Sequence, residues 1–258
     1  MDGYDETTYG ERFADVYDEW YGAITDATAC AALVAELADL GDDLGGGPVL
    51  ELGVGTGRLA IPIAALGLEV VGVDASTAML ERLTAKAADG TVEAVLGDFA
   101  DPPVGERRFA VALVAYNTLF NLTEPGAQAR CFERVADLLL PGGSFLVEAF
   151  VPDADEAQAS VEPRAIAADR VVLSVSRTDP ARQEAMGQHV DITEQGIRLR
   201  PWHIRWSTTE QLDAMAAAAG LRLADRWSDW ARTPFGDDDP VHVSRYVRDA
   251  RGAPGRAS

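Results

Sequence analysis

VLELGVGTGRLAIPIA, residues 49–64, is the stretch of the sequence that decides the fold. A short hydrophobic run is followed by Gly53, Gly55 and Gly57 at every second position, and then by a helical pattern. Glycines at these places let the chain turn tightly off a strand, and they let a ligand approach the main chain at the N-terminus of the next helix. The segment therefore predicts a strand, a ligand-binding turn and a helix, in that order.

Side chains around this turn distinguish between two types of nucleotide cofactor. Dinucleotide-binding proteins have a similar turn, but they need Gly or Ala where this chain has the bulky Arg58. Glu51 lies at the end of the strand, where a carboxylate would repel a pyrophosphate but would suit an ammonium group. Asp74 follows the next β-rich run and can accept hydrogen bonds from ribose hydroxyls. Either cofactor would use Asp74, whereas Arg58 and Glu51 favour a ligand with an adenosine ribose and an amino-acid head.

Short β-rich runs alternate with helical stretches up to about Phe150, which is typical of an α/β protein with a doubly wound parallel sheet. Two helices are expected before this core, near Glu11–Tyr21 and Asp26–Leu40. The expected core strands are Pro48–Leu52, Leu68–Asp74, Val92–Leu96, Phe109–Ala115 and Ser144–Phe150, and the expected helices are Gly57–Leu66, Ser76–Ala87 and Ala127–Leu140.

The alternation of strand and helix patterns ends after Phe150. An acidic, loop-like stretch leads to three β-rich runs that are joined too closely for a helical crossover, so they predict an inserted antiparallel meander. A capping box from Ser207 to Glu210 then predicts a helix that ends at Gly220. The expected meander strands are Arg170–Ser176, Gly187–Ile192 and Ile197–Trp206, and the expected final strands are Leu221–Trp227 and Val241–Val247, the last one antiparallel.

Polar and aromatic residues follow several of the core strands. Asp98 and Phe99 come after the third strand, where they can bind an adenine amine and cover the ring. Tyr116, Asn117 and Asn121 come after the fourth strand, where the carboxyl ends of neighbouring strands open into a crevice. We expect these last three residues to contact the substrate.

The residues described above, together with a turn at Pro141-Gly142-Gly143, make the chain resemble the class I S-adenosyl-L-methionine (SAM)-dependent methyltransferases. They are Glu51 to Gly57, Asp74 and the Asp98–Phe99 pair. The resemblance covers residues 45–150 and, with the closing helix and strands, extends to about residue 247. It implies a Rossmann-like sheet of seven strands with an antiparallel last strand, SAM as the cofactor and S-adenosyl-L-homocysteine as the product.

The same resemblance implies roles for individual residues. The Gly53–Gly57 loop would hold the methionine part of SAM, Asp74 would bind the ribose, and Asp98 with Phe99 would bind the adenine. The remaining implied cofactor neighbours are Ala75 and Met79 at the adenine, Ala115 and Tyr116 near the sulfonium, and Glu51 beside the loop.

Residues 7–22, TTYGERFADVYDEWYG, are similar to the lid helix of small-molecule members, notably sugar-amine N-methyltransferases of antibiotic pathways. There a pair of tyrosines eight positions apart, matched by Tyr9 and Tyr17, closes over the cofactor. The meander is similar in placement to the insertion that caps the active site in that group. Asn121 stands where those enzymes often carry a histidine, so a sugar amine is only one of the substrates considered.

The expected domains are a lid over 1–44, a core over 45–150, a cap over 151–206, closing elements over 207–248 and a flexible tail over 249–258.

Methyl transfer from a sulfonium is an in-line displacement, so the protein mainly has to hold the reacting groups in line and exclude water. A neutral amine needs no base, whereas a hydroxyl does, and His203, Glu148 and Tyr116 are the candidate catalytic residues. Cys30 and Cys131 are expected to be buried thiols, and no metal site is expected. The predicted function is methyl transfer to N or O of a small molecule, a secondary metabolite. A nicotinamide-dependent oxidoreductase and a non-catalytic SAM-binding scaffold are the alternatives.

The chain of 258 residues carries 22 basic and 42 acidic side chains, a formal net charge of −20. Such a surface repels phosphate backbones and anionic lipids, which argues against nucleic-acid and membrane partners. Residues 1–50 hold twelve acids against one base, Arg12. We interpret this excess as a solvated acidic face, and electrostatic steering of cationic SAM or an amine toward the site is the alternative. No apolar run approaches the ~20 residues of a membrane-spanning helix, and the acidic N-terminus does not resemble a signal peptide, so we expect a cytoplasmic protein. The sequence leaves the oligomeric state open, with a homodimer as one option.

Overall fold

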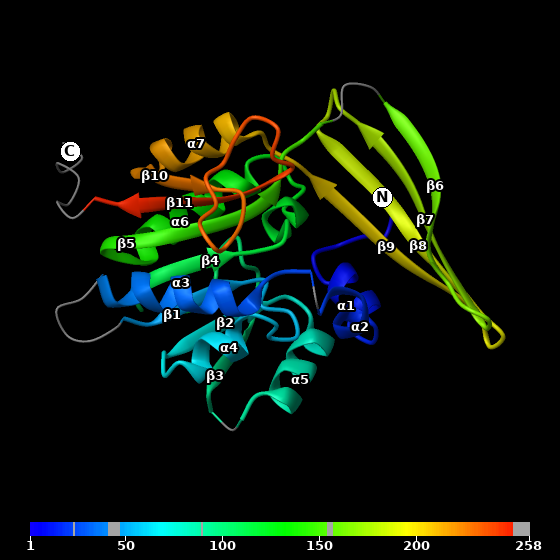
Figure 1. Ribbon diagram of the computed structural model, residues 1–258, viewed down its shortest axis with the longest axis horizontal. Helices are drawn as coiled ribbons and strands as arrows, with labels where there is room; N and C mark the ends of the chain where they lie inside the picture. Colours follow the sequence, from blue (N-terminus) through cyan, green and yellow to red (C-terminus); the bar gives the residue numbers. More distant parts are fainter. Residues whose placement is uncertain (23, 41–46, 89, 154–156, 250–258) are drawn as a thin grey trace.

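The structure is a computed structural model that describes residues 1–22, 24–40, 47–88, 90–153 and 157–249. Its centre is a seven-stranded sheet in the order β10-β11-β5-β4-β1-β2-β3 (Figure 1). Neighbouring strands from β3 to β5 pair in parallel, and β11 pairs antiparallel with both β5 and β10. The sheet confirms the predicted fold class. Its strands are β1 (Val49–Leu52), β2 (Val70–Asp74), β3 (Val92–Leu96), β4 (Phe109–Val114), β5 (Leu139–Phe150), β10 (Leu221–Trp227) and β11 (Val241–Arg248).

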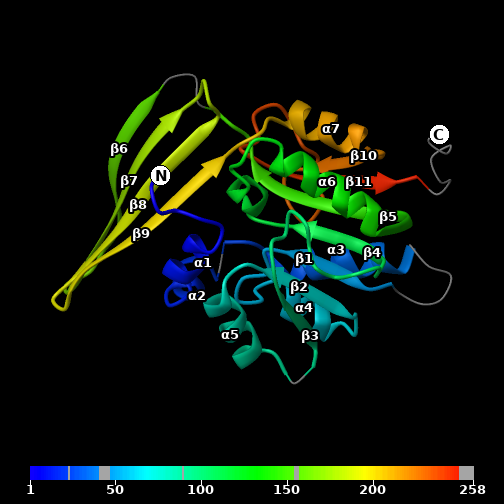
Figure 2. The same cartoon turned by 180° about the vertical axis from the view of Figure 1, so that it is seen from behind.

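Helices cover both faces of this sheet (Figures 1 and 2). Alternate residues of β4 belong to two buried clusters, with Val111 and Leu113 in one and Ala112 and Val114 in the other. A strand buried on both faces has to be apolar throughout, which is why the whole of β4 is hydrophobic. The first cluster includes side chains of α3 (Ala27–Leu40), α4 (Ala60–Ala65) and α5 (Thr77–Lys86), and the second includes those of α6 (Ala127–Leu138) and α7 (Thr209–Ala218).

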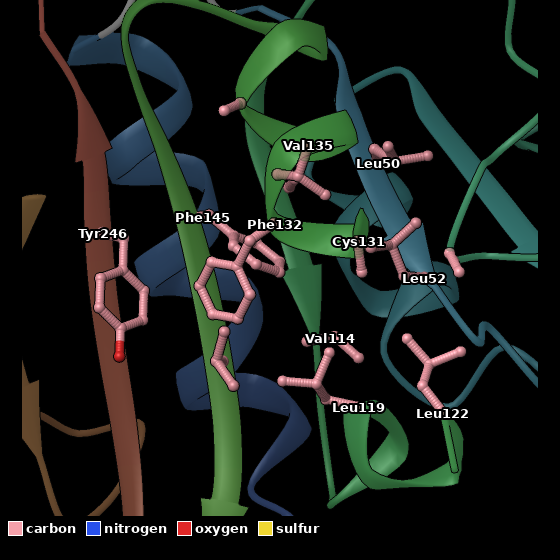
Figure 3. Close-up of a cluster of buried hydrophobic side chains, with 14 of the residues drawn as sticks. Leu50, Leu52, Val114, Leu119, Leu122, Cys131, Phe132, Val135, Phe145 and Tyr246 are labelled. Carbon is pink, nitrogen blue, oxygen red and sulfur yellow. The ribbon is translucent and has the colours of Figure 1, made fainter. Parts of the chain in front are cut away.

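The centre of the second cluster is aromatic (Figure 3). The ring of Phe132 on α6 lies 5.1 Å from that of Phe145 and 5.5 Å from that of Tyr246, both edge to face. Cys131 is a buried free thiol in this cluster, and Cys30 is a buried free thiol in the cluster around α3. The sheet therefore lies between the two thiols.

Four differences from the expected elements have physical causes in the structure. The segment expected as one helix over Glu11–Tyr21 forms two short helices, α1 (Thr8–Phe13) and α2 (Tyr17–Tyr21). The break places Asp15 where its carboxylate accepts hydrogen bonds from the guanidinium of Arg200. A long-range ion pair therefore overrides the local helical preference of this segment.

The inserted sheet has four antiparallel strands where three were expected: β6 (Gln158–Ile166), β7 (Arg170–Asp179), β8 (Glu184–Thr193) and β9 (Gly196–Arg205). We call this sheet the cap. Strand β6 lies in the stretch interpreted as a loop, because its acidic residues and Pro163 do not look like a strand. It forms the edge of the cap, and its register shifts between Pro163 and Ala165, so the proline is accommodated at a bulge.

The other two differences concern strand and helix ends. Strand β5 starts at Leu139, so the Pro141-Gly142-Gly143 segment lies inside the strand, at the register shift where Phe109 pairs with Leu139 but Val111 pairs with Ser144. Helix α7 is capped one residue later than predicted. Its capping box joins Thr208 and Gln211 rather than Ser207 and Glu210, because the Thr208 hydroxyl accepts the hydrogen bond from the Gln211 N–H.

Parts of the predicted linker and tail, residues 41–46 and 250–258, lie outside the described residues. Among the residues that are described, no helix is long and apolar enough to cross a membrane. The expected domain boundaries remain predictions.

Candidate active site

The glycine turn after β1 has the backbone that its sequence predicts. Gly53, Gly55 and Gly57 have φ angles of +67°, +54° and +83°, a region that side chains disfavour. A Cβ added to Gly55 would come within 4.0 Å of the Met79 sulfur and 3.9 Å of the Tyr17 ring, in the space that these residues surround. The turn therefore leaves room for a ligand to lie against the main chain.

Asp74 ties this turn to the end of β2. Its Oδ2 accepts a hydrogen bond from the Gly55 N–H at 2.8 Å, and its Oδ1 accepts one from the Ser76 N–H at 2.9 Å. Burial raises the pKa of Asp74, and the two N–H donors oppose that effect. Each carboxylate oxygen keeps a free lone pair, so Asp74 can still accept hydrogen bonds from a ligand.

A first cavity lies at this edge of the sheet, between the core and the N-terminal helices, and we call it the cofactor cavity. Four carboxylates line it, from Asp5, Glu6, Asp74 and Asp98, whereas no Lys or Arg does so in the described part of the chain. Nine of the twelve predicted cofactor residues line it: Tyr9, Tyr17, Gly53, Gly55, Asp74, Ala75, Met79, Asp98 and Phe99.

The other three predicted cofactor residues lie outside the lining. Gly57 packs against Leu83, and Ala115 is buried. Glu51 is 5% exposed, and its Oε2 has no hydrogen-bond partner among the described residues. Burial raises the pKa of Glu51 to about 8, although the charge of Arg58 works against this. A buried carboxyl oxygen without a partner is what an ammonium group of a ligand would satisfy.

The N-terminal helices are held over the cofactor cavity by carboxylates. Glu11 on α1 accepts hydrogen bonds from the Ser76 hydroxyl and the Ala78 N–H, at the start of α5. Asp18 on α2 accepts them from the Thr56 hydroxyl at 2.6 Å and from the ammonium of Lys86 at 2.8 Å. These contacts place Tyr9 and Tyr17 against the cavity, as expected of a lid.

A second cavity of about 170 Å³ lies between the core, the lid and the cap, and we call it the acceptor cavity. Tyr9, Tyr17, Thr118 and Asn121 line both cavities, so the two cavities meet at these residues. The predicted substrate residues Tyr116, Asn117 and Asn121 all line it. The rest of its lining is Tyr21, Phe150, Arg164, His189, Trp202 and Ile204, together with the four shared residues.

Tyr116 and Asn117 form an unusual turn between β4 and the short helix η1 (Thr118–Asn121). Both have positive φ angles, +48° and +64°, although neither is a glycine. Glu148 on β5 holds the turn, because its Oε2 accepts a hydrogen bond from the Tyr116 N–H at 2.8 Å. Its other oxygen accepts one from the indole of Trp230 at 2.8 Å. Glu148 therefore positions Tyr116, and its two oxygens already have donors.

The structure does not bring His203 to these residues. Side chains alternate along β9, so Trp202 and Ile204 face the acceptor cavity while His203 lines a separate hollow with Glu184 and Arg205. Burial lowers the pKa of His203.

Other residues of the acceptor cavity were missed by the sequence analysis. His189 and Arg164 belong to the cap, where only the alternation along each strand indicates which side chains face inward. Tyr4, Asp5 and Glu6 line the cofactor cavity although they precede the first predicted helix.

Comparison with known proteins identifies the family. A family model described as a methyltransferase domain matches residues 49–143. The solved structure of the CcbJ methyltransferase from Streptomyces caelestis is 41% identical to this chain, with a TM-score of 0.87, and the match covers 96% of this chain and 100% of that one. The chain belongs to the class I SAM-dependent methyltransferases.

Two further relatives of this methyltransferase extend over most of its length. Cypemycin N-terminal methyltransferase from Streptomyces sp. is 29% identical over 90% of this chain and 94% of its own. SAM-bound CalS10, an amino pentose methyltransferase from Micromonospora echinaspora, shares the fold at 21% identity and a TM-score of 0.67, over 90% of this chain and 96% of its own. The cofactor of the methyltransferase is SAM rather than a nicotinamide.

The residues of the cofactor cavity fit SAM, which carries a positive sulfonium and an ammonium. The four carboxylates of the lining complement that charge, Gly55 leaves the cradle open, and Glu51 offers an unpartnered buried oxygen. When bound, SAM supplies a methyl group that is already activated by the sulfonium. The residues of the methyltransferase therefore have to hold the acceptor in line and keep water out.

Proposed function

We propose that the protein transfers the methyl group of SAM to the nitrogen of a small-molecule amine in secondary metabolism. The observation that supports this most directly is the junction of the two cavities at Tyr9, Tyr17, Thr118 and Asn121. A small acceptor in the second cavity would meet the methyl donor there. The name of the cypemycin relative, an N-terminal methyltransferase, supports nitrogen as the acceptor atom.

The titratable groups at the acceptor cavity favour an amine over a hydroxyl. A hydroxyl needs a general base with a pKa near neutrality, whereas an amine only has to be neutral. Burial raises the pKa of Tyr17 to about 12 and lowers the pKa of His189 to about 4. Burial raises the pKa of Glu148, but Glu148 does not line the acceptor cavity, and its oxygens accept hydrogen bonds from the Tyr116 N–H and the Trp230 indole. We therefore assign no general base, and Tyr116, Asn117 and Asn121 position the acceptor.

The roles proposed for the cofactor residues follow the shape of the cofactor cavity. Asp74 binds the ribose, Asp98 and Phe99 bind the adenine, and Tyr9 and Tyr17 cover the cofactor as parts of a lid. The net charge of −20 supports a small-molecule acceptor rather than a nucleic acid. We also propose a cytoplasmic location and a homodimer that forms through the cap.

Thermal denaturation with SAM, S-adenosyl-L-homocysteine and NAD, each added separately, tests the cofactor. A ligand that binds the native state raises the melting temperature, so we expect a rise with the first two and none with NAD. Asp74→Ala should abolish the rise without unfolding the protein, because it removes the ribose acceptor. Asp101→Ala is the matched control, since this carboxylate is 71% exposed and pairs with Arg134. Unchanged affinity in Asp74→Ala would overturn the assignment of the ribose site.

Turnover is tested by incubation with SAM and a panel of amines and their hydroxyl analogues. We expect products heavier by one methylene from amines only. Methylation of the hydroxyl analogues would contradict the choice of nitrogen. The absence of any product across a broad panel, with SAM binding intact, would favour the scaffold alternative.

A further inference from the structure

The two cavities that meet at the lid tyrosines have opposite charge. Asp5, Glu6, Asp74 and Asp98 line the cofactor cavity without a Lys or Arg among the described residues. Arg164 lines the acceptor cavity, and no Asp or Glu from the described ranges does so. This is unexpected in a chain with a net charge of −20. The acceptor cavity therefore does not share the acidic character of the rest of the molecule.

Arg164 is held at the cavity by aromatic rings of the lid. Its guanidinium carbon lies 5.0 Å from the ring centre of Tyr21 and 5.1 Å from that of Trp20. Stacking on two rings fixes the plane of the guanidinium while leaving its N–H groups at the rim available. Among the residues that the structure describes, Arg164 has no carboxylate within ion-pair distance.

Two further polar groups of this cavity are buried, unlike the exposed Arg164, and lack partners. His189 is 7% exposed, and its Nδ1 has no hydrogen-bond partner among the described residues. The indole N–H of Trp202 is likewise buried and without an acceptor in the described chain. The rings of these two residues lie 6.4 Å apart, and both line the acceptor cavity. Buried polar groups are normally hydrogen-bonded, so a bound ligand would supply the partners that these two atoms lack.

The chemistry of these groups defines the ligand. A guanidinium and an indole N–H can only donate hydrogen bonds, so the matching ligand group is an acceptor. The positive charge of Arg164 favours an acceptor that is also an anion. A carboxylate has the planar pair of oxygens that a guanidinium binds in a fork. The cavity of about 170 Å³ suits a fragment of the size of an amino acid.

We propose that Arg164, Trp202 and His189 form a subsite for a carboxylate of the methyl acceptor, so that the substrate is an amine that also carries a carboxylate. This rests on the proposed function, which places the amine at the junction of the cavities. Arg164 lines only the acceptor cavity, so the carboxylate lies away from the junction. The subsite thereby orients the amine toward the cofactor, and Arg164 is a specificity-determining residue.

The experiment compares matched ligands: α-amino acids, their carboxamides and the corresponding α-aminophosphonates, which keep the amine and change the anion. Binding is measured by thermal shift in the presence of S-adenosyl-L-homocysteine, and methylation by mass spectrometry. We expect at least one acid to bind roughly tenfold or more tightly than its carboxamide, as for a charge-assisted contact. Equal affinity of acids and carboxamides, or no binding of either, overturns the subsite. A preference for phosphonates over acids would replace the carboxylate by a phosphoryl group.

Substitutions of Arg164 test whether this residue causes the preference for acids over carboxamides. Arg164→Gln should remove the preference for acids, Arg164→Lys should keep part of it, and neither should change the shift with S-adenosyl-L-homocysteine alone. Arg177→Gln, at an exposed position of β7, is the matched control. A preference that survives Arg164→Gln overturns the assignment of Arg164. Acids that bind through Arg164 but are never methylated would contradict the proposed function alone, and amines methylated regardless of an anion would contradict the subsite alone.

Discussion

Tyr116 and Asn117 are residues with a strained backbone that line the acceptor cavity. Two successive left-handed residues cost conformational energy, and such residues persist only where surrounding contacts hold them. Three hydrogen bonds do so here: from the Tyr116 N–H to Glu148, from the Asn117 N–H to the Glu148 carbonyl, and from the Phe150 N–H to the Asn117 side chain. The turn places Tyr116 in the lining of the acceptor cavity.

Substitutions of Asn117 separate this strain from the hydrogen bond. Asn117→Ala and Asn117→Gly both remove the acceptor for the Phe150 N–H, but only glycine relieves the left-handed backbone. We expect the alanine variant to lose about 2 kcal/mol of the free energy of unfolding and the glycine variant about 1 kcal/mol less than that. Urea denaturation measures both. Equal losses would show that the turn is not strained.

Glu51 makes the stability of the ligand-free protein depend on pH. Its pKa is about 8 in the folded protein and near 4.5 in the unfolded chain, so the folded state binds the proton more tightly. The resulting stabilisation is complete below pH 4.5 and is lost as the pH rises through 8. We expect the free energy of unfolding to fall more steeply between pH 5 and 8 in the wild type than in Glu51→Gln. Parallel curves would contradict the raised pKa of Glu51.

The residues of the cofactor cavity were largely predictable, because the carboxyl ends of parallel strands meet at one edge of the sheet. Asp74, Asp98 and Phe99 each follow a strand and come together there. No such rule applies to the first residues of the chain, which the lid carries to the cavity. His203 shows the opposite failure: its cap strand was predicted, but not which side chains of that strand face the cavity.

At the scale of elements, the lid depends on contacts rather than on its own helices. Isolated helices as short as α1 and α2 are unstable in water. Both therefore rely on carboxylates that reach the core and the cap. Asp15, between them, accepts hydrogen bonds from Arg200, which is also bonded to the Arg12 carbonyl.

The two cap arginines that contact Asp15 provide a matched pair of variants. The Arg200 side chain is 4% exposed and that of Arg198 is 73% exposed. Arg200→Met should cost about 2 kcal/mol of the free energy of unfolding, reduced from the value for a fully buried pair because Asp15 is 38% exposed. Arg198→Met should cost under about 0.5 kcal/mol. Urea denaturation tests this, and equal costs would show that Arg200 does not hold the lid.

Elements of the core were predicted closely, because short β-rich runs bounded by turn residues are strong local signals even for the two edge strands of the sheet. Val92–Leu96 and Leu221–Trp227 agree residue for residue with β3 and β10. Strand β6 was missed because its acidic residues and Pro163 interrupt the β-rich pattern that identified the other edge strands, and only the bulge after Pro163 accommodates the proline. The break between α1 and α2 was missed because its cause, Arg200, lies far away in the sequence.

At the scale of the whole molecule, the cap exposes an apolar face and buries a face that mixes polar and apolar side chains. The buried face toward the lid carries His189, Asp191 and Arg200, whereas the exposed face carries Ile197 at 66% and Leu199 at 54% exposure. The register places further apolar side chains on that exposed face: Val161, Pro163, Ile166, Val171, Leu173, Val175, Met186, Val190, Ile192 and Pro201. Figure 1 shows the cap standing out from the core beside the lid.

We propose that a second copy of the chain covers this face. Four strands of about ten residues present roughly 600 Å², which approaches the ~800 Å² per subunit of a stable interface. The charged side chains of this face, such as Arg177, Glu184 and Arg205, lie at one end of the strands, so its apolar part is where two copies with a net charge of −20 can approach each other. A two-fold contact would pair the face with itself.

Light scattering in solution should therefore give twice the mass of the 27.5 kDa chain. Leu199→Glu should convert the dimer to monomer, because it buries an unpaired charge in the interface. Leu66→Glu, at a leucine that is 56% exposed on the core, is the control and should leave the dimer intact. A monomeric wild type, or a dimer unaffected by Leu199→Glu, would contradict the interface.

The cap also has little tolerance for errors in strand alignment. One layer of backbone carries the wall of the acceptor cavity on one side and the apolar face on the other, and side chains alternate between them along β9. A slip of one residue would turn Trp202 and Arg200 outward and send Leu199 and His203 toward the lid. Loss of the active site and exposure of unpaired charge on the outer face would then occur together. Insertions or deletions of a single residue within these strands are therefore far more damaging than substitutions on either face.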